Sequence, residues 1–206
     1  MVDLTIKQGT DEWKQLRLGK VTASRVADIL AKTKTGPSAS RQNYLIELAI
    51  QRVTNIIQES YSNSAMEWGV ENEAQARVAY EVASMNFVDQ VPFVDHPTIK
   101  NFGASPDGLI GKEGLIEIKC PNSATHWEYF KTKEAPKKYF IQMQAQMSCT
   151  GRKWCDFVSF DPRMPERSQL LIVHVPRDNE FIATMEAEIQ QFLNEVEVEV
   201  NLMKGK

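Results

Sequence analysis

The spacing of hydrophobic and polar positions along the chain follows two different periods, which predicts a mixture of helices and strands. Apolar residues three or four positions apart predict helices over residues 10–19, 22–30, 41–53, 64–83, 122–131, 136–149 and 179–203. Short runs rich in β-branched and aromatic residues predict strands over residues 91–94, 99–103, 154–160 and 169–175. The interleaving of these elements predicts an α/β protein.

Residues 105–119 predict a further pair of strands, joined by a tight turn. The segment Gly111-Lys112-Glu113-Gly114 is a glycine-bounded turn between two apolar stretches, which is typical of a β-hairpin. A hairpin brings Asp107 beside Glu117, and residues two apart in a strand share a face, so Lys119 lies on the side of Glu117. Two carboxylates and an amine are therefore expected to converge.

The two carboxylates, Asp107 and Glu117, favour a divalent metal ion. Two acidic groups at short distance repel unless a cation neutralises them, and oxygen ligands without sulfur or imidazole suit Mg²⁺ or Mn²⁺. The alternative is an ordinary hairpin whose charges are solvated. The position of the Glu117-Ile118-Lys119-Cys120-Pro121 segment at the end of an apolar strand favours the metal site.

Glu73 is a candidate third carboxylate on the predicted helix 64–83. Ser64 and Glu67 have the spacing of a capping box at the start of this helix. The side chain of Glu73 could point into a cleft, or form an exposed pair with Arg77 one turn later.

A second group of polar residues is suited to binding phosphate. Thr22 is expected to cap the helix over residues 22–30, and Arg17, Ser24 and Arg25 lie near the start of this helix. Free backbone N–H groups and a positive dipole end attract anions there. Ordinary helix capping is the alternative.

Glutamines are concentrated in the predicted helix 136–149. Gln142 and Gln146 lie one turn apart on one face, whereas Gln144 points elsewhere, and either face could present an amide to a substrate or to water. Residues 32–40 are polar around a Gly-Pro pair and are expected to form a surface loop.

Length and composition predict one domain over residues 1–206. The chain is 42% hydrophobic and 25% charged, and it has no apolar run long enough to span a membrane. Its first residues lack the apolar core of a signal peptide, so we expect a cytoplasmic protein.

Cysteine content and charge distribution narrow the chemistry further. Three cysteines without a CxxC pair argue against a disulfide framework and against a four-cysteine metal site, and favour buried thiols. The net charge is −3, but residues 1–53 hold nine Lys or Arg against five acids, and residues 112–153 hold eight against four. A basic surface around an acidic centre is therefore expected.

Taken together, these motifs resemble the phage lambda exonuclease-like viral recombinases of the PD-(D/E)xK nuclease superfamily. The matching segments cover most of the chain and occur in the order of that family: Trp13, Leu16-Arg-Leu-Gly19, Val21-Thr-Ala-Ser24, Trp68-Gly69, Glu73, Ala76-Arg77, Ser105-Pro-Asp-Gly108, Glu117-Ile-Lys-Cys-Pro121, Tyr139, Gln142, Gln144 and Asp161-Pro-Arg-Met164.

The resemblance implies a central mixed β-sheet flanked by helices, the restriction-endonuclease-like core of that superfamily. It also implies an exonuclease that digests one strand of a DNA duplex from a 5′-phosphorylated end and leaves a 3′ overhang. A ring-shaped homotrimer around DNA, cooperation with a phage single-strand annealing protein, and action in a bacterial host cell are implied as well.

The family's catalytic residues correspond to residues of this chain one by one. Asp107 and Glu117 match ligands of two Mg²⁺ ions, with the carbonyl of Ile118 as a third ligand. Glu73 matches an acid near the second metal, and Lys119 matches the catalytic lysine. Close to the metals and partly desolvated, Lys119 is expected to have a lowered pKa, and to activate water or stabilise transition-state charge.

The family's DNA-binding residues can be transferred in the same way. Met66 matches an apolar wedge at the terminal base pairs, and Lys34 matches a basic residue that follows the DNA. The residues matching the 5′-phosphate anchor are Arg17, Ser24, Ser105 and Gln142.

Two other functions are compatible with these motifs. A restriction-type endonuclease uses the same catalytic centre, since the PD-(D/E)xK core serves many nucleases. A non-catalytic module that binds DNA ends could retain the fold, although the intact acids and lysine argue against it.

Overall fold

A mixed five-stranded sheet forms the centre of the computed structural model, which describes residues 6–34, 36–57 and 64–206. In spatial order the strands are β10 (Leu170–Pro176), β9 (Trp154–Phe160), β8 (Gly114–Lys119), β7 (Gly108–Ile110) and β4 (Val88–Asp89). Strands β8 and β9 are parallel, and the other neighbours are antiparallel. The predicted mixed sheet flanked by helices is therefore confirmed.

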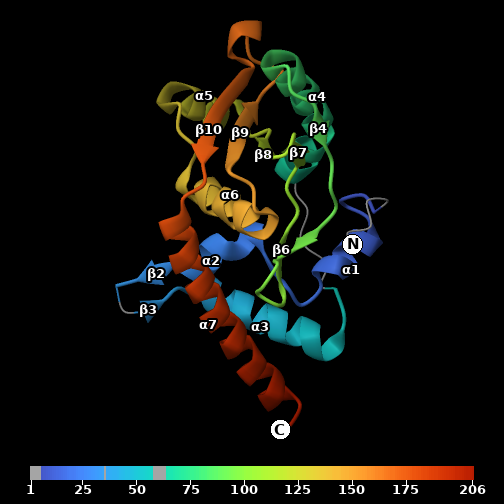
Figure 1. Cartoon of the computed structure of the whole chain (residues 1–206), viewed down its shortest axis with the longest axis vertical. Helices are drawn as coiled ribbons and strands as arrows, with labels where there is room; N and C mark the ends of the chain where they lie inside the picture. Colours follow the sequence, from blue (N-terminus) through green and yellow to red (C-terminus); the bar gives the residue numbers. More distant parts are fainter. Residues whose placement is uncertain (1–5, 35, 58–63) are drawn as a thin grey trace.

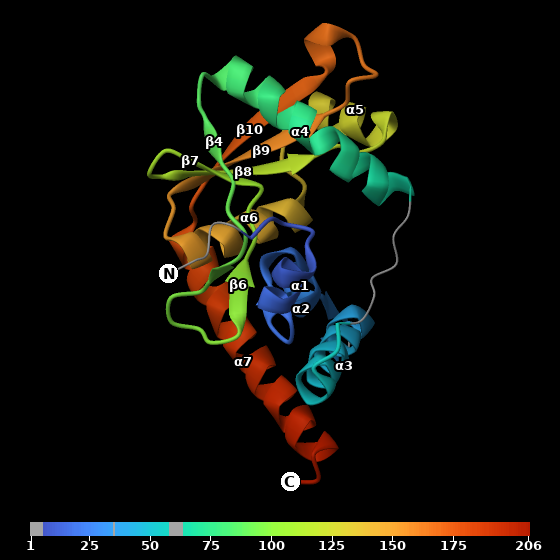
Figure 2. The same cartoon turned by 90° about the vertical axis from the view of Figure 1, so that its right-hand side faces the viewer.

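Helices cover both faces of this sheet, as Figure 2 shows, with α4 (Ser64–Ser84) on one side and α6 (Lys137–Thr150) on the other. On the first face, Tyr80 of α4 packs in a buried cluster with Ile116 and Ile118 of β8. On the second face, α6 shares the larger core with Phe157, and α5 (Ser123–Thr132) packs beside it. Alternating residues of β8 thus face opposite helices.

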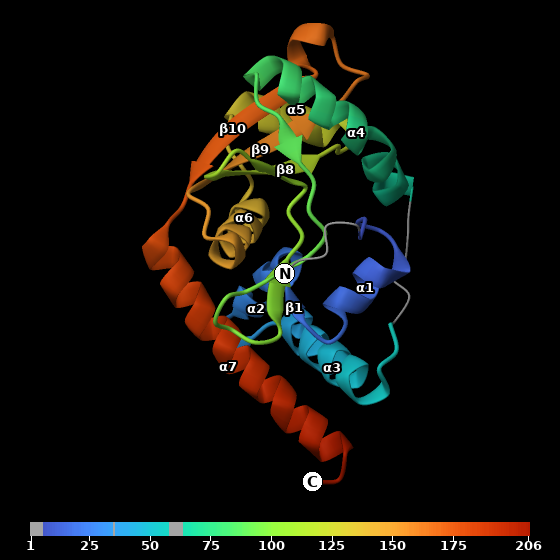
Figure 3. The same cartoon turned by 45° about the vertical axis from the view of Figure 1, so that its right-hand side comes forward.

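The other half of the molecule is mainly helical (Figures 1 and 3). The long helix α7 (Asn179–Met203) extends away from the sheet and packs against α3 (Ala39–Thr54). This half also contains α1 (Asp11–Arg17), the 3-10 turn η1 (Ala23–Arg25), α2 (Val26–Leu30), and a three-stranded sheet of β1 (Val21–Thr22), β6 (Phe102–Ala104) and β5 (Val94–Asp95). A second 3-10 turn, η2 (Glu166–Ser168), lies between β9 and β10. The apolar spacing within residues 179–203 predicts one buried stripe, and it is buried except at Phe181, which is partly buried; the stripe consists of Phe181, Met185, Ile189, Phe192, Val196 and Val200.

Several predicted elements differ in the structure. The strand predicted over residues 91–94 is reduced to Val94 at its end, because Pro92 offers no N–H to a ladder, although Val91 and Phe93 are buried. The strand predicted over residues 99–103 begins only at Phe102. Residues 1–5, and residues 58–63 of the polar connection before α4, lie outside the described residues.

The segment expected to be a polar loop, residues 32–40, contains a small hairpin of β2 (Lys32–Thr33) and β3 (Gly36–Pro37) before α3 begins. The prediction that Thr22 caps a helix is also wrong. Its side chain makes no capping bond, because a 3-10 turn intervenes and its hydroxyl instead lies 3.3 Å from that of Ser24.

The hairpin predicted within residues 105–119 is confirmed as β7 and β8, with Gly108 opposite Ile116. Gly111 in the turn has a φ of +49°, a conformation that glycine adopts without strain. A Cβ atom on Gly108 would lie 2.1 Å from the side chain of Val88, so glycine allows β4 to approach the residue that follows Asp107.

All three cysteines are free and buried, as predicted. Within the described parts of the chain, no helix has the length and apolar character needed to cross a membrane.

Candidate active site

The hairpin brings Asp107 against β8, as the sequence predicts. The Asp107 Oδ2 atom accepts a 2.6 Å hydrogen bond from the backbone N–H of Ile118. This bond holds the carboxylate beside Glu117, the preceding residue of the same strand. One short stretch of chain therefore brings two acidic groups together through the backbone geometry of the hairpin.

Glu117 is fully buried, and amide groups of α6 surround it. Its Oε1 accepts a 2.7 Å hydrogen bond from Gln142, and its Oε2 accepts a 2.6 Å bond from Gln146. Gln144 points away and bonds to the carbonyl of Pro176, as expected from helical periodicity. A buried carboxylate needs such donors, and both glutamines meet this need.

Lys119 completes the cluster from the same face of β8. Its Nζ contacts the Oε1 of Glu117, and lies 5.3 Å from the centre of the Tyr139 ring. Burial lowers the pKa of Lys119, but the carboxylates of Glu117 and Asp107 outweigh burial and raise it. Without a bound cation, these two acidic neighbours stabilise the ammonium form, so the pKa is raised. A lowered pKa of Lys119 beside bound metal ions stays a prediction.

Glu73 reaches the same region from α4. Burial raises its pKa, while the positive charges of Arg77 and Lys119 act to lower it and the charge of Glu117 acts to raise it. The predicted alternative, a direct ion pair with Arg77, does not form between the described side chains. Instead, Nη1 of Arg77 is buried without a hydrogen-bond partner in the described part of the chain.

The pKa of Asp107 is raised well above its usual value, first by burial and then by the charge of Glu117. This site concentrates negative charge that the described protein groups only partly compensate. No three His, Cys, Asp or Glu side chains among the described residues are arranged closely enough to hold a metal ion together. The oxygen donors are nevertheless of the type that Mg²⁺ or Mn²⁺ prefers.

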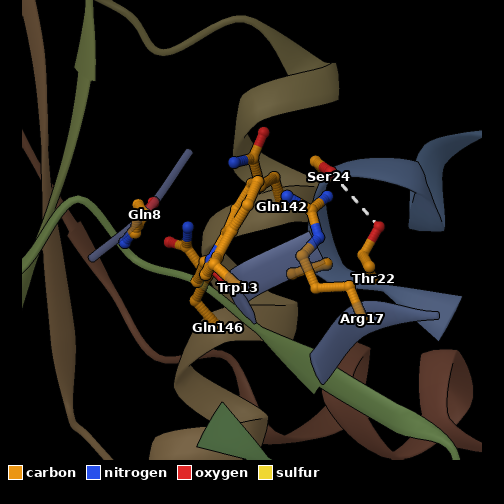
Figure 4. Close-up of a pocket in the computed structure, with 9 residues that line it drawn as sticks. Gln8, Trp13, Arg17, Thr22, Ser24, Gln142 and Gln146 are labelled. Atoms are coloured by element: carbon orange, nitrogen blue, oxygen red, sulfur yellow. Dashed lines mark hydrogen bonds between the residues drawn. The ribbon is translucent and has the colours of Figure 1, made fainter. Parts of the chain in front are cut away.

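A cavity of about 140 Å³ adjoins this cluster. Figure 4 shows that its lining comes from the N-terminal segment, from η1 and from α6. The four residues predicted to anchor a phosphate all line it: Arg17, Ser24, Ser105 and Gln142. Gln142 faces the cavity and also bonds to Glu117, so the cavity and the acidic cluster share a wall.

Trp13 determines how this cavity is built. Its ring lies 3.9 Å below the Arg17 guanidinium, and its Nε1 donates a 2.9 Å hydrogen bond to the hydroxyl of Ser105. The helical spacing of Trp13 and Leu16 predicts that both side chains face the core, but α1 has no buried residue and both are only partly buried. The spacing of four between Trp13 and Arg17 was a usable sequence signal for their contact.

Arg17 is the basic group of the cavity. Burial lowers its pKa, and within the described residues no carboxylate pairs with it. By contrast, Arg25 pairs with Asp28 and Glu47, so its charge is neutralised inside the protein. The guanidinium of Arg17 therefore retains its capacity to bind an anion.

Three other lining residues, Gln8, Thr22 and Gln146, were not predicted to belong to a phosphate site. Gln8 donates to the carbonyls of Val91 and Pro106, and so fixes the segment that precedes Asp107. No pattern in the sequence indicates these long-range contacts.

Met66 and Lys34 do not line the cavity. Met66 lies in the first turn of α4 with 51% of its surface exposed, and Lys34 is exposed in the hairpin between β2 and β3. Their predicted roles on DNA stay predictions.

Arg163 joins three of the sequence motifs. Its guanidinium lies 4.1 Å from the centre of the Trp68 ring, forms a salt bridge with Asp161, and donates a 3.2 Å hydrogen bond to the carbonyl of Pro121. These contacts tie α4 and the end of β8 to the loop after β9. They therefore support the position of Lys119 without contacting it.

The Asp161 carboxylate gives a test of this junction. Burial would raise its pKa, but hydrogen bonds from Arg163 and Ser123 outweigh burial and lower it to about 2. Because the pKa of Asp161 is lower in the folded protein than in the unfolded chain, its ionised carboxylate stabilises the fold at pH values above the usual pKa of an aspartate. This stabilisation is lost as the pH falls through about 2. We expect Asp161→Asn to lower the free energy of unfolding by ~2 kcal/mol at pH 7.

Urea unfolding at pH 7 and at pH 2.5 measures this difference, with Glu166→Gln, a change at an exposed acid in η2, as the control. The decrease in the free energy of unfolding caused by Asp161→Asn should be smaller at pH 2.5 than at pH 7. An equal decrease at both pH values would contradict the lowered pKa of Asp161.

Comparisons with known proteins identify relatives of this chain. Residues 12–153 match the model of the YqaJ-like viral recombinase domain. The crystal structure of LHK-Exo in complex with dAMP is 51% identical, with a TM-score of 0.89 over 95% of this chain and 96% of that chain. The alkaline exonuclease LHK-Exo from Laribacter hongkongensis, in a second crystal structure, is 50% identical with a TM-score of 0.88 over the same shares of both chains.

A phage-related exonuclease from Haemophilus somnus 129PT shares the fold, with a TM-score of 0.71 and 18% identity over 93% of this chain and 98% of that chain. A comparison with curated protein sequences gives no match. The family match covers the hairpin of Asp107 and Glu117 and most of the cavity, and it confirms the resemblance inferred from the motifs. The chain therefore belongs to the family of YqaJ-like viral recombinase domains.

Proposed function

We propose that this protein is a Mg²⁺-dependent 5′–3′ exonuclease that digests one strand of linear double-stranded DNA and leaves a 3′ overhang for recombination. The observation that carries the proposal is the shared wall between the acidic cluster and the cavity. Gln142 bonds to Glu117 on one side and lines the Arg17 cavity on the other. A terminal phosphate held by Arg17 would thus lie next to the groups suited to hydrolysis.

The relatives support this class of reaction. LHK-Exo, which is about half identical to this chain, is an alkaline exonuclease. One of its crystal structures contains dAMP, a nucleoside monophosphate. A nucleoside monophosphate is the product that removal of one terminal nucleotide releases.

Asp107, Glu117 and the carbonyl of Ile118 are the residues that would hold divalent metal, with Glu73 near a second ion. The donor set fits such ions, since it contains only oxygen atoms and places Asp107, whose pKa is raised by burial and then by the charge of Glu117, beside a second carboxylate. Bound Mg²⁺ or Mn²⁺ would supply a water of lowered pKa and charge neutralisation at the phosphorus.

Lys119, which contacts Glu117, would either orient or deprotonate the attacking water or stabilise negative charge on the phosphoryl oxygens. Gln142 and Gln146 hold Glu117 in a fixed orientation through their hydrogen bonds to it.

The cavity would set the direction of digestion. Arg17 and the hydroxyls of Ser24 and Ser105 would bind the 5′-phosphate, and every cleavage would generate a new 5′-phosphate for the same cavity. Met66 would act as an apolar wedge at the terminal base pairs, and Lys34 would contact the DNA along its length. A ring-shaped homotrimer around the DNA and a phage single-strand annealing protein as partner complete the proposal.

Covalently closed and linear forms of one plasmid test the proposal against the endonuclease alternative. With Mg²⁺ we expect acid-soluble nucleotides from the linear form and an intact closed circle. Cutting of the closed circle would identify an endonuclease, and the absence of nucleotide release from both forms would leave a DNA-end-binding module.

A further inference from the structure

A groove of about 400 Å³ lies between α5 and η2, separate from the cavity that Arg17 lines. One wall comes from α5, and the other comes from the chain between β9 and β10. The lining residues are Trp127, Phe130, Met164, Pro165, Arg167 and Ser168. We call this site the α5–η2 groove. It shares no lining residue with the Arg17 cavity, so it is a second place where a ligand could bind.

Buried His126 ties the two walls of the groove together. Its Nδ1 lies 2.8 Å from the hydroxyl of Ser159 in β9. Its Nε2 donates a 2.8 Å hydrogen bond to the carbonyl of Ser168, because a carbonyl can only accept. The side chain of Gln169 donates a further bond to the carbonyl of Met164. These bonds join α5 to β9 and η2, so the groove is formed before any ligand binds.

The same bonds place the groove close to the acidic cluster. The parallel strands β8 and β9 pair Lys119 with Ser159, and the hydroxyl of Ser159 contacts His126, which precedes Trp127. Neighbouring strands are about 4.8 Å apart. Figure 2 shows α5 beyond the end of β8, to which only three residues connect it. A ligand in the groove would therefore lie near the end of the strand that carries Lys119.

The aromatic wall has the geometry of a stacking surface. The ring centroids of Trp127 and Phe130 are 5.6 Å apart, and the two ring planes are inclined by only 10°. Trp127 is 43% exposed, so its side chain is open to solvent on the groove side of this pair. A planar nucleobase can extend such a stack, and because every base has a flat face, this contact tolerates any sequence.

Arg167 is the one charged residue among the described residues that line the groove, and no described carboxylate pairs with it. The segments that carry the groove, residues 123–138 and 161–168, hold six Lys or Arg against four Asp or Glu, although the whole chain has a net charge of −3. Two of these acids, Glu128 and Asp161, form salt bridges within the segments. The surroundings of Arg167 therefore favour an anion such as a phosphate.

We propose that the α5–η2 groove binds the single-stranded DNA that digestion leaves, with one base stacked on Trp127 and a phosphate beside Arg167. The inference rests on the proposed function, which removes one strand and leaves the other unpaired. A nucleotide presents a flat apolar face and an anion together, and the groove offers an aromatic ring and a cation together. Binding of the undigested strand there would keep the duplex end near the acidic cluster between successive cleavages.

Binding of an oligothymidylate tests the groove without cleavage. The probe is a fluorescent strand of about 12 nucleotides with a 5′-hydroxyl end, and its anisotropy is measured with the full chain in EDTA. We expect Trp127→Ala and Arg167→Ala each to weaken binding by about 10-fold. Trp127→Phe keeps a ring in the groove, so it should bind nearly as tightly as the unmodified protein.

Two control variants remove the same kinds of group elsewhere. Phe87→Ala removes a ring that is 86% exposed, and Lys204→Ala removes an exposed positive charge at the end of α7. Both should leave binding unchanged, and equal weakening by either control would overturn the proposal. If Trp127→Ala and Arg167→Ala bind like the unmodified protein, the proposal is also overturned, and the groove is left for an apolar protein segment. Arg167 is exposed, so its variant tests the groove even if Trp127→Ala fails to fold.

Photo-cross-linking locates the bound strand directly. An oligothymidylate with one 5-iododeoxyuridine is irradiated on the unmodified protein, and the cross-linked peptide is identified by mass spectrometry after proteolysis. We expect the DNA on the peptide that contains Trp127. Attachment to the peptides of Trp13 or Trp68 instead, or no attachment, would contradict the proposed site.

Nucleotide release from linear duplex separates failure of this inference from failure of the proposed function. A protein that releases nucleotides with Mg²⁺, but binds the oligothymidylate equally well with and without Trp127, would refute the groove alone. A protein that binds the oligothymidylate through Trp127 and Arg167, but releases no nucleotides, would refute the proposed function alone.

Discussion

Replacing Asp107 with asparagine is expected to reduce nucleotide release from linear duplex by ~10³-fold or more. The substitution removes one of the two carboxylates of the hairpin while the side-chain oxygen remains able to accept the hydrogen bond from Ile118. Because only the charge is lost, binding of duplex DNA should persist. Release of acid-soluble nucleotides and gel-shift binding measure the two effects separately.

The same substitution should stabilise the fold, which distinguishes lost chemistry from lost structure. The folded-state pKa of Asp107 is raised, so its stabilising contribution is full below the usual pKa and is lost as the pH rises through the folded value. At pH 8 without divalent ions, Asp107→Asn should therefore raise the free energy of unfolding by ~1 kcal/mol. Full activity in this variant, or loss of activity together with unfolding, would contradict the assignment.

Replacing Arg17 with alanine is expected to weaken digestion of a 5′-phosphorylated duplex by ~10- to 100-fold, the loss of one charge-assisted contact. A duplex with a 5′-hydroxyl end should be affected far less, because it lacks the phosphate that Arg17 binds. Initial rates on the two duplexes, for the unmodified protein and the variant, measure this difference.

Lys14→Ala is the matched control, since Lys14 lies on the same helix and is paired with Asp11 at the surface. It should change both rates little. If Arg17→Ala lowered the initial rates on both duplexes equally, Arg17 would not be the 5′-phosphate anchor. If Arg17→Ala and Lys14→Ala lowered the rates by similar factors, the effect would be a general attraction of DNA to positive charge.

The sequence was sufficient for the parts of the site that local geometry controls. The spacing of Asp107, Glu117 and Lys119 around a glycine-bounded turn determines their convergence, because hairpin register and strand alternation depend on neighbouring residues. The convergence of Arg17, Ser24, Ser105 and Gln142 came from the family resemblance, since four separate segments supply these residues.

Other features depend on tertiary contacts that leave no local pattern. Trp13 has the spacing of a core residue, but it lines the cavity because its N–H bonds to Ser105, which is 92 positions away. The pKa of Lys119 without a bound cation is raised by contact with buried Glu117, although desolvation acts to lower it. The interruption of a predicted strand at Pro92, by contrast, could have been predicted from the sequence, because proline has no backbone N–H to donate to a neighbouring strand.

The central claim is that one site both holds a 5′-phosphate and cleaves the next bond. A linear duplex with a radioactive 5′-phosphate on one strand and a fluorescent 3′ end on the same strand tests it most directly, in a single Mg²⁺-dependent time course. We predict that the 5′ label is released first as a mononucleotide, while the 3′ label stays on long fragments. Release of the 3′ label before the 5′ label would contradict the account. So would early cuts inside the strand, which leave the two labels on separate long fragments.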